Sequence, residues 1–380
     1  MPSTFGSTLR VSVFGQSHSA AIGCVVEGLP SGIAVDTEAL ELFMSRRAPG
    51  RGSWSTPRSE ADAVRIVSGL NQGGETCGAP LAMLIENTNV RPGDYDSLRY
   101  VPRPGHADFT AWAKWNGNQD ASGGGHFSGR LTAPLCAAGA VALQALGLRG
   151  VRIGAHLLEV AGITDEAFDA LDNSPAASQR LRAQLDALAD GRTFPVLSQP
   201  AGERMVSAID DARRAEDSVG GIVECVAAGM PRGIGSPMFD GIENMIARAA
   251  FGIPAVKGIE FGRGFDVALL RGSENNDPYE MRDGMPTPST NNAGGILGGI
   301  STGAPLLFRL AIKPTPSIAR RQRSVNIRTS ETEELEIRGR HDPCIAPRAV
   351  PVAEAVCALS LLDAILSYPP EEMHLGGAGQ

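Results

Sequence analysis

Residues 24–33 read CVVEGLPSGI, and residues 225–234 read CVAAGMPRGI. The two stretches agree at six of ten positions and are separated by a constant 201 residues. Each is an apolar run that ends in glycine and proline, which is typical of a strand followed by a tight turn. The repeat therefore predicts two related halves, roughly residues 1–200 and 201–370, whose turns surround a shared cleft.

A helical pattern follows each of these strands. Residues 37–48 place their apolar side chains on one face, with Asp36 or Thr37 as N-cap, and residues 236–250 predict a second helix capped by Ser236. A looser echo pairs residues 123–129 with residues 294–303, although two glycine-rich turns can also be similar by chance. Each half is thus predicted to contain a strand, a turn and a helix in succession.

The composition is that of a globular protein. The chain has 380 residues, of which 42% are hydrophobic. Its net charge of −8 and its lack of a long basic run argue against nucleic-acid binding, so an anion should bind in a local pocket. The first twenty residues do not resemble a signal peptide, and no run of about 18 apolar residues predicts a membrane span. We therefore expect a cytoplasmic protein that binds neither membrane nor nucleic acid.

The cysteines, the polar segments and the C-terminal residues say less about function. The six cysteines lie far apart without a CxxC pair, so we expect buried thiols and neither a zinc site nor a disulfide framework. Residues 164–191 have leucines at helical spacing, which predicts one or two surface helices. Residues 271–295 are polar, and a loop of this length is often a lid or a binding loop. Residues 371–380 are expected to form a frayed tail.

Four of the six histidines stand among glycine, serine, aspartate or proline, namely His18, His106, His126 and His341. Histidine can donate and accept a proton near neutral pH, so several of them in loop-like segments indicate an acid–base site. Taken singly, each is more readily explained as a hydrogen-bonded structural residue. His156, inside the strand-like run VRIGAHLLEV, is predicted to be a satisfied core residue.

Cationic side chains occur in the same kinds of segment: Arg46, Arg47, Arg51, Arg58, Arg130, Arg340 and Arg348, with Lys313 at the start of KPTPS. A guanidinium group offers a rigid fork of donors that suits carboxylate or phosphate, which predicts an anion pocket. For Arg46 and Arg51, a paired and solvated surface position is an equal alternative. The chain has no P-loop, GxSxG or HExxH motif, which excludes the commonest nucleotide and hydrolase sites.

Taken in order, several long motifs resemble those of the chorismate synthase family over nearly the whole chain. The matching segments are FGQSHSAAIG, RRAPGRGSWSTPRSEADAVRIVSGL, RPGHADFTAWAKW, GGGHFSG, DSVGGIVECVAAGMPRGIG, AVKGIEFGRGF, NNAGGILGGISTGAP, KPTPSI and GRHDPCIAPRAVPVAEA. The resemblance implies a carbon–oxygen lyase that converts 5-enolpyruvylshikimate 3-phosphate to chorismate, the last step of the shikimate pathway. This 1,4-elimination releases phosphate and a ring proton and needs reduced FMN (FMNH2), which can lend electron density for the loss of an allylic phosphate.

The resemblance also implies roles for single residues. His106 would protonate the departing phosphate, His18 would keep the reduced flavin in the right protonation state, and Asp342 would act with the flavin N5 in removing the ring proton. The expected substrate and anion contacts are Ser17, Arg47, Ser128, Arg130 and Arg348. The expected FMN contacts are His126, Phe127, Ser128, Ala255, Gly298, Lys313, Pro314, Thr315, Pro316, Ser317 and Arg340, and no metal site is implied.

The chain departs from the family pattern at two turns. The family usually has GESHG where this chain has GQSHS at residues 15–19, and GGGRSSARET where this chain has GGGHFSGRLT. The glycines are expected to let the backbone approach flavin and substrate, with His126, Ser128 and Arg130 pointing into that space. An arginine often present near Ser53 is replaced, so flavin reduction by the chain itself with NADP(H) is unsupported, and a separate flavin reductase is an alternative.

For the fold, the resemblance implies one α+β domain over residues 1–380, with a helical layer sandwiched between antiparallel β-sheets, a pseudo-two-fold duplication and a homotetramer. Two other functions stay open. One is a metal-dependent hydrolase with His106, Asp108, His341 and Asp342 as ligands. The other is a flavin- or metabolite-binding protein that lost activity through the changes at Gln16 and His126. A pure binding protein has little need for His18, His106 and Asp342 together, which favours the enzyme.

Overall fold

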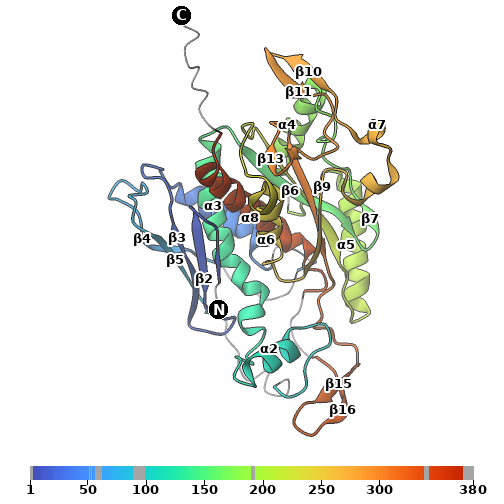
Figure 1. Cartoon of the computed structure of the whole chain (residues 1–380). Coiled ribbons are helices and arrows are strands. Elements are labelled where there is room, and N and C mark those ends of the chain that lie inside the picture. Colours follow the sequence, from blue (N-terminus) through green and yellow to red (C-terminus); the bar gives the residue numbers. More distant parts are fainter. Residues whose placement is uncertain are drawn as a thin grey trace, which may run out of the picture.

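The computed structural model describes residues 3–50, 52, 54–55, 62–88, 99–189, 193–337 and 342–370. Two five-stranded antiparallel sheets dominate it (Figure 1). The first has the order β1-β2-β3-β5-β4, formed by Thr4–Phe5, Arg10–Phe14, Ala21–Glu27, Leu81–Glu86 and Arg65–Ser68. The second has the order β7-β6-β8-β14-β9, formed by Ile163–Thr164, Arg152–Val160, Gly221–Ala228, Leu306–Ile312 and Val256–Phe261. The strands predicted from the repeat, β3 and β8, are the central strands of the two sheets.

Two-stranded hairpins and short helical turns lie outside these two sheets. The two-stranded hairpins are β10 with β11 (Tyr279–Arg282, Met285–Pro288), β12 with β13 (Ile296–Leu297, Ile300–Ser301) and β15 with β16 (Gln322–Asn326, Glu331–Leu335). Short helical turns are η2 (Gly125–Phe127), η3 (Gly129–Leu131), η4 (Met238–Asp240), η5 (Gly264–Leu269) and α7 (Gly272–Asn275). The predicted loop at 271–295 therefore contains α7 and the β10–β11 hairpin.

The helices predicted from the sequence are found with one correction. In α1 (Thr37–Arg47), Asp36 accepts a hydrogen bond from the Ala39 N–H at 2.9 Å, as an N-cap does. The second prediction is partly wrong, because extended Gly241 separates η4 from α6 (Ile242–Ala250), so Ser236 is not the N-cap. Within 164–191 the structure forms α4 (Pro175–Ala189), and α5 (Gln199–Arg214) follows beyond the predicted segment. The α+β class is confirmed.

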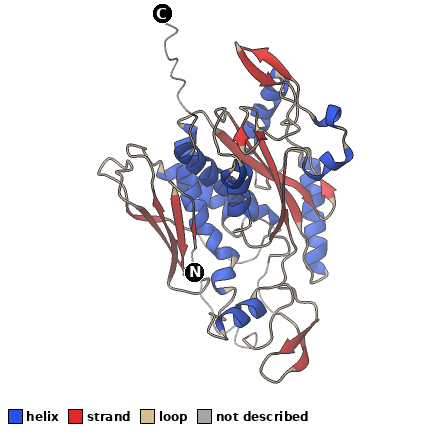
Figure 2. Ribbon diagram, viewed as in Figure 1, coloured by secondary structure: helices blue, strands red, loops and turns tan. Residues whose placement is uncertain are grey.

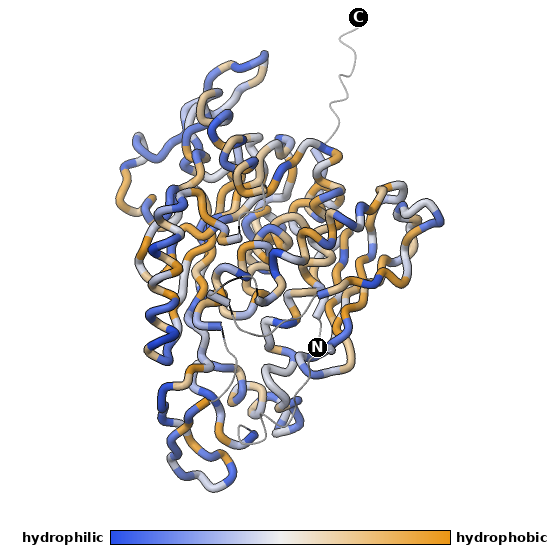
Figure 3. The backbone as a smooth tube through the Cα atoms, turned by 180° about the vertical axis from the view of Figure 1, so that it is seen from behind, coloured by the Kyte–Doolittle hydropathy of each residue, from blue (hydrophilic) through white to orange (hydrophobic). Residues whose placement is uncertain are grey.

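Two long apolar helices, α3 (Thr132–Gly147) and α8 (Ala346–Ser367), form the centre of the core. α3 packs on β3 and β5, α8 packs on β6 and β8, and the two helices pack on each other (Figure 2). Their backbones come close, because a Cβ on Gly139 would lie only 2.3 Å from the Cβ of Ala355. In the backbone trace, hydrophobic segments gather toward the middle of the molecule (Figure 3).

The same two helices have the length and composition of membrane spans. The apolar windows that pass this test lie in residues 129–147 and 346–367, and they are 72% and 94% buried inside the fold. Such burial is typical of core helices. The cysteines follow the prediction in five cases, since Cys24, Cys136, Cys225, Cys344 and Cys357 are buried thiols, whereas Cys77 is exposed.

His156 on β6 confirms the prediction of a satisfied core histidine. The residue is fully buried, and its ring nitrogens lie 3.1 Å from Asp165 Oδ2 and 3.1 Å from Glu224 Oε2. Burial favours the neutral ring, but the hydrogen bonds and charges of the two carboxylates outweigh it and raise the pKa of His156. The side chain is therefore held in its protonated form.

We expect His156 to make the stability of the fold depend on pH. Because its pKa is raised on folding, the stabilisation is fully present below about pH 6.5 and is lost as the pH rises through the folded-state pKa. The free energy of unfolding, measured by urea titration, should therefore fall from neutral to alkaline pH. The His156→Gln variant should be less stable at low pH and should lack this part of the decline. Parallel curves for the two proteins would contradict the prediction.

Candidate active site

A cavity of about 760 Å³ lies beside the N-terminus of α8. Its walls come from segments that are far apart in the sequence, namely parts of 17–18, 47–49, 103–107, 123–132, 251–257, 313–317 and 342–352. A cavity of this size holds a small molecule or a cofactor. No residue of 271–295 lines it, so the expected lid or binding loop does not serve this cavity.

Ser17 and His18 stand in the turn between β2 and β3. The Ser17 side chain is buried, and its Oγ lies 2.9 Å from His18 Nδ1 and donates to the Ser122 carbonyl oxygen at 3.1 Å. The Ser17 N–H donates to the Gly125 carbonyl oxygen at 3.0 Å. These contacts hold the His18 ring at the cavity wall and join its turn to the triple glycine.

The triple glycine is needed for packing within the chain itself. Gly123 has φ +65°, and a Cβ there would lie 2.4 Å from His18 Cε1 and 2.7 Å from His18 Nδ1. A Cβ on Gly124 would lie 2.9 Å from the Cβ of Ser128. The close approach that demands glycine is therefore toward His18 and Ser128, and not, as the sequence suggested, only toward a ligand.

We expect Gly123→Ala to destabilise the fold and displace His18. The new methyl group adds a steric clash to an unfavourable φ, and together these should lower the free energy of unfolding by about 2 kcal/mol. Gly129→Ala is the matched control, because a Cβ at Gly129 meets no atom within 4 Å. Chemical denaturation of both variants tests the prediction, and equal losses of stability would contradict it.

His106 lies in the loop that leads into α2 (Asp108–Trp115). Its Nδ1 lies 2.5 Å from Asp108 Oδ1, and Arg103 binds the same carboxylate at 2.7 and 2.8 Å. The Lys313 ammonium donates to the Gly105 carbonyl oxygen in this loop. The imidazole is thus oriented by its own loop and reaches the cavity.

Arg47 and Arg130 are both buried and share the carboxylate of Asp62, which is also buried. Burial favours the neutral form of Asp62, but the two guanidinium groups outweigh it and lower the pKa of this carboxyl group. Burial, aided by the charges of Arg348 and Arg130, lowers the pKa of Arg47 although Asp62 opposes the shift. Buried cations that share one counter-ion are well suited to receive a second anion.

Arg348 extends this cationic cluster along α8. Its Nη1 donates to Asp342 Oδ2 at 2.6 Å, and its Nε donates to the Arg47 carbonyl oxygen at 3.1 Å. Arg46 points elsewhere, because it forms a two-pronged ion pair with buried Glu354 at 2.6 and 2.7 Å. For Arg46 the structure therefore decides in favour of an ion pair within the protein.

The residues expected to hold FMN lie largely on one wall. Lys313, Thr315, Pro316, Ser317 and Ala255 line the cavity. Among the described residues, buried Thr315 Oγ1 has no hydrogen-bond partner. Burial and the nearby Lys257 lower the pKa of Lys313. A hydroxyl without a described partner and an ammonium group on the same wall fit a phosphate group, so this donor set suits the phosphate of a flavin nucleotide.

Two other expected flavin contacts, Pro314 and Gly298, do not line this cavity. Pro314 does not line the cavity and packs against Gly220. Gly298 lies in the β12–β13 turn, where the neighbouring Gly299 carbonyl oxygen accepts a hydrogen bond from Ile242 N at the start of α6. Residues that follow the other end of this helix, from Phe251, line the cavity. Arg340, like His341, lies outside the described residues.

The His-Phe pair that replaces Arg-Ser has contacts of its own. The ring nitrogens of His126 lie 2.9 Å from Ser3 Oγ and 3.0 Å from the Gly15 carbonyl oxygen. The Phe127 ring packs against Trp115 with ring centroids 5.8 Å apart. The Ser128 hydroxyl accepts from Arg130 N at 3.1 Å. All three residues line the cavity, but His126 and Ser128 are engaged by the protein.

The sequence reasoning missed Asp62, Arg103 and Lys257 and considered Asp108 only as a metal ligand. Arg103 and Asp108 flank His106 in RPGHAD, so their proximity could have been noticed, whereas nothing local marks Asp62 as the partner of two arginines. Within the part of the chain that the structure describes, no group of three His, Cys, Asp or Glu side chains is arranged to hold a metal ion.

The chain matches known proteins along nearly its whole length. The family model for chorismate synthase matches residues 9–366. A chorismate synthase of Lancefieldella parvula is 52% identical over 374 residues, covering 98% of each chain, and one of Methanosarcina acetivorans is 44% identical, covering 95% of each. A crystal structure of chorismate synthase superposes with a TM-score of 0.73 at 26% identity, covering 95% of this chain and 92% of that one. The extent of the family match and the identity to these relatives show that the chain belongs to the chorismate synthase family of enzymes.

Proposed function

We propose that this enzyme removes phosphate and a ring proton from 5-enolpyruvylshikimate 3-phosphate, giving chorismate, with reduced FMN bound in the same cavity. The observation that carries the proposal is the cavity itself, which unites three histidines, an aspartate and four arginines from remote segments. A dianionic phosphate and two carboxylates on the substrate need such a surplus of cations in a chain whose net charge is −8.

Binding of FMN is supported by the wall that contains Lys313, Thr315 and Ser317. The unpaired Thr315 hydroxyl and the Lys313 ammonium would hold the flavin phosphate, with Ala255 alongside. When bound, reduced FMN supplies electron density that assists departure of the allylic phosphate. The cavity volume of about 760 Å³ is within the range that holds a cofactor and a small substrate together.

The chain's own groups then handle protons and charge. We assign to His106 the proton that neutralises the departing phosphate oxygen, because its ring is fixed by Asp108 and reaches the cavity. His18, held by Ser17, would hold a proton at the flavin side of the cavity. Asp342, paired with Arg348, would take part in removal of the ring proton. Arg47, Arg130 and Arg348 would bind the substrate anions.

The test is anaerobic phosphate release from 5-enolpyruvylshikimate 3-phosphate with chemically reduced FMN, beside an oxidised-FMN control. We expect release only with reduced FMN, accompanied by equimolar chorismate. Flavin binding without release would favour the inactive binding protein instead. Repeating the assay with oxidised FMN and NADPH distinguishes reduction by the chain itself from reduction by a separate flavin reductase.

We also propose that the fold is an internal duplication in which the central helices are sandwiched between the two sheets. β2, β3, α1, β4, β5 and α3 correspond in order to β6, β8, α6, β9, β14 and α8. The bridge between Ala34 and Glu75 has a counterpart between Gly235 and Ile300, in which Gly235 follows Ala34 by 201 residues and Ile300 follows Glu75 by 225 residues. On this correspondence the boundary between the halves lies near residue 150, with α4 and α5 inserted in the second half.

Assembly as a homotetramer is supported by exposed apolar side chains. Met238, Phe239, Phe265 and Leu269, in η4 and η5, are 76%, 83%, 82% and 84% exposed. Large exposed apolar residues of this kind often mark a protein interface. Light scattering of the purified protein should give four times the chain mass of 39.7 kDa; a monomer mass would overturn the proposal.

A further inference from the structure

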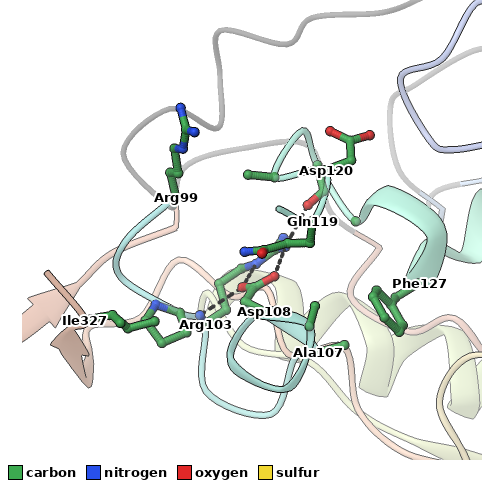
Figure 4. Close-up of a pocket in the computed structure, with 13 residues that line it drawn as sticks. Arg99, Arg103, Ala107, Asp108, Gln119, Asp120, Phe127 and Ile327 are labelled. Carbon is green, nitrogen blue, oxygen red and sulfur yellow. Dashed lines mark hydrogen bonds and ion pairs between the residues drawn. The ribbon is translucent and has the colours of Figure 1, made fainter. Parts of the chain in front are cut away.

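The loop that carries His106 has a second set of contacts on the side of Arg103. The Arg103 side chain is buried, and its Nε and Nη2 donate to the two oxygens of Asp108 at 2.7 and 2.8 Å. Figure 4 shows this pair beside Gln119 and Asp120, at a small recess of about 20 Å³. Both oxygens of the Asp108 carboxylate thus accept hydrogen bonds from the Arg103 guanidinium group, which fixes the plane of the carboxylate.

The contact between Asp108 and His106 locates a proton. The 2.5 Å separation of His106 Nδ1 and Asp108 Oδ1 requires a hydrogen between them, because two lone pairs would repel at this distance. Burial favours the acid form of Asp108, but hydrogen bonds from Arg103 and His106 outweigh it and hold the pKa of this carboxyl group well below its usual value. Arg103 Nη2 also lies 3.2 Å from His106 Nδ1, but its two hydrogens have shorter contacts with Asp108 Oδ1 and the Gly123 carbonyl oxygen, at 2.8 and 2.7 Å. The proton therefore belongs to His106 Nδ1, which donates to an ionised carboxylate.

Arg103 connects this arrangement to the rest of the cavity. Its Nη2 also donates to the Gly123 carbonyl oxygen at 2.7 Å, and its Nη1 donates to Ser317 Oγ at 3.3 Å. Gly123 packs against His18, and Ser317 belongs to the expected flavin wall. One buried guanidinium therefore fixes the His106 loop relative to both neighbouring parts of the site.

We propose that Asp108 and Arg103 are positioning residues for His106, in which the carboxylate keeps one proton on Nδ1 and leaves Nε2 to exchange a proton with the ligand. The inference rests on the proposed function, in which His106 protonates the departing phosphate. Donation from Nε2 then leaves the neutral Nδ1–H form, the form that Asp108 stabilises. In serine proteases, an aspartate that fixes the histidine tautomer in this way contributes a large factor to turnover.

The test replaces the carboxylate by an amide. With Asp108→Asn, the amide NH2 replaces either Oδ2, which accepts from Arg103 N and Nε, or Oδ1, which contacts Arg103 Nη2 and His106 Nδ1. The imidazole can change its tautomer and the guanidinium cannot, so the NH2 is expected at Oδ1, where it disfavours the Nδ1–H form of His106. We expect kcat for phosphate release to fall roughly 100-fold or more, with KM and the Kd of FMN within about threefold of wild type. Asp120→Asn is the matched control, since Asp120 lines the same recess and accepts from Ser122 N at 2.9 Å without a contact to His106 among the described residues, and its kcat should be unchanged.

Two readouts separate positioning from a merely structural role. Solid-state ¹⁵N NMR of histidine-labelled protein can report the tautomer of His106, whose signals are assigned as those missing from the spectrum of His106→Ala. We expect the Nδ1–H form in wild type, and we expect Asp108→Asn to lose this form. In the His106→Ala background, Asp108→Asn should change kcat by less than about threefold, because the group it acts through is gone. An unchanged tautomer, or a loss of kcat that multiplies with that of His106→Ala, would overturn the proposal.

A conservative variant guards against misfolding. Asp108→Glu keeps the carboxylate but shifts it by about one methylene. We therefore expect a roughly tenfold loss of kcat when His106 is present and no loss in the His106→Ala background. Equal losses of kcat in both backgrounds would contradict a positioning role. The NMR measurement does not depend on turnover. If the wild-type enzyme released no phosphate from 5-enolpyruvylshikimate 3-phosphate, the proposed function would fail, while the tautomer of His106 would still decide the role of Asp108.

Discussion

Replacement of His106 by alanine should lower kcat for phosphate release by about 10³-fold while leaving the Kd of FMN within about twofold, since a positioned general acid contributes roughly 10²–10⁴-fold. The reason is that His106 is the imidazole whose ring is fixed by an ionised carboxylate while it lines the cavity. The expected flavin wall, which includes Thr315 and Ser317, belongs to another part of the chain. Anaerobic phosphate release and the quenching of FMN fluorescence measure the two quantities separately.

His126→Ala is the control for this prediction. His126 also lines the cavity, but its ring nitrogens are engaged by Ser3 and the Gly15 carbonyl oxygen. Its loss should therefore change kcat far less than the loss of His106. If the two alanine variants lost kcat equally, the proton would have to come from another group, and the role assigned to His106 would be wrong.

Replacement of Asp62 by alanine should give the largest loss of stability. The carboxylate is the shared counter-ion of Arg47 and Arg130, and the side chains of all three residues are 5% exposed or less. Removing one member of a buried ion pair leaves an uncompensated charge in the interior, which costs about 3–5 kcal/mol. We expect the free energy of unfolding, measured with urea, to fall by this amount.

Two further measurements make the Asp62 prediction specific. Asp186→Ala removes the partner of Arg152 in an exposed ion pair and should leave stability unchanged within error. Inorganic phosphate should raise the melting temperature of Asp62→Ala more than that of wild type, because the anion replaces the lost carboxylate between the two arginines. A small loss of stability with no response to phosphate would show that Arg47 and Arg130 find other partners.

Local patterns predicted the elements that depend on local forces. The β3 and β8 strands, α1 with its Asp36 cap and buried His156 follow from hydrophobic runs, turn residues and a capping side chain within a few positions. The second predicted helix was misplaced for a local reason as well, since the extended conformation of Gly241 interrupts 236–250. The similarity of residues 24–33 and 225–234 is visible in the sequence because the two stretches share the glycines and the proline of a turn.

The site was predictable only in part. His18, His106, Arg47, Arg130 and Arg348 were expected, and the structure brings them to one cavity. The pairing of Asp62 with two arginines was not expected, because Arg130 lies 68 residues from Asp62 along the chain and no spacing rule connects them. Gly298 was assigned to the flavin from its motif; it does not line this cavity, and the neighbouring Gly299 contacts the start of α6.

The sequence by itself determined the family, the α+β class and the types of side chain available for acid–base and anion chemistry, because these depend on residue identity and on order along the chain. Only the tertiary structure decided which of those side chains are free to act. Arg46 forms an ion pair with Glu354, and the ring nitrogens of His126 contact Ser3 and Gly15. The ring of His106, in contrast, is oriented toward the cavity by Asp108 and Arg103. Hydrogen bonds and ion pairs extend over only a few ångströms, so the partner of each polar group is set by the folding of distant segments against one another.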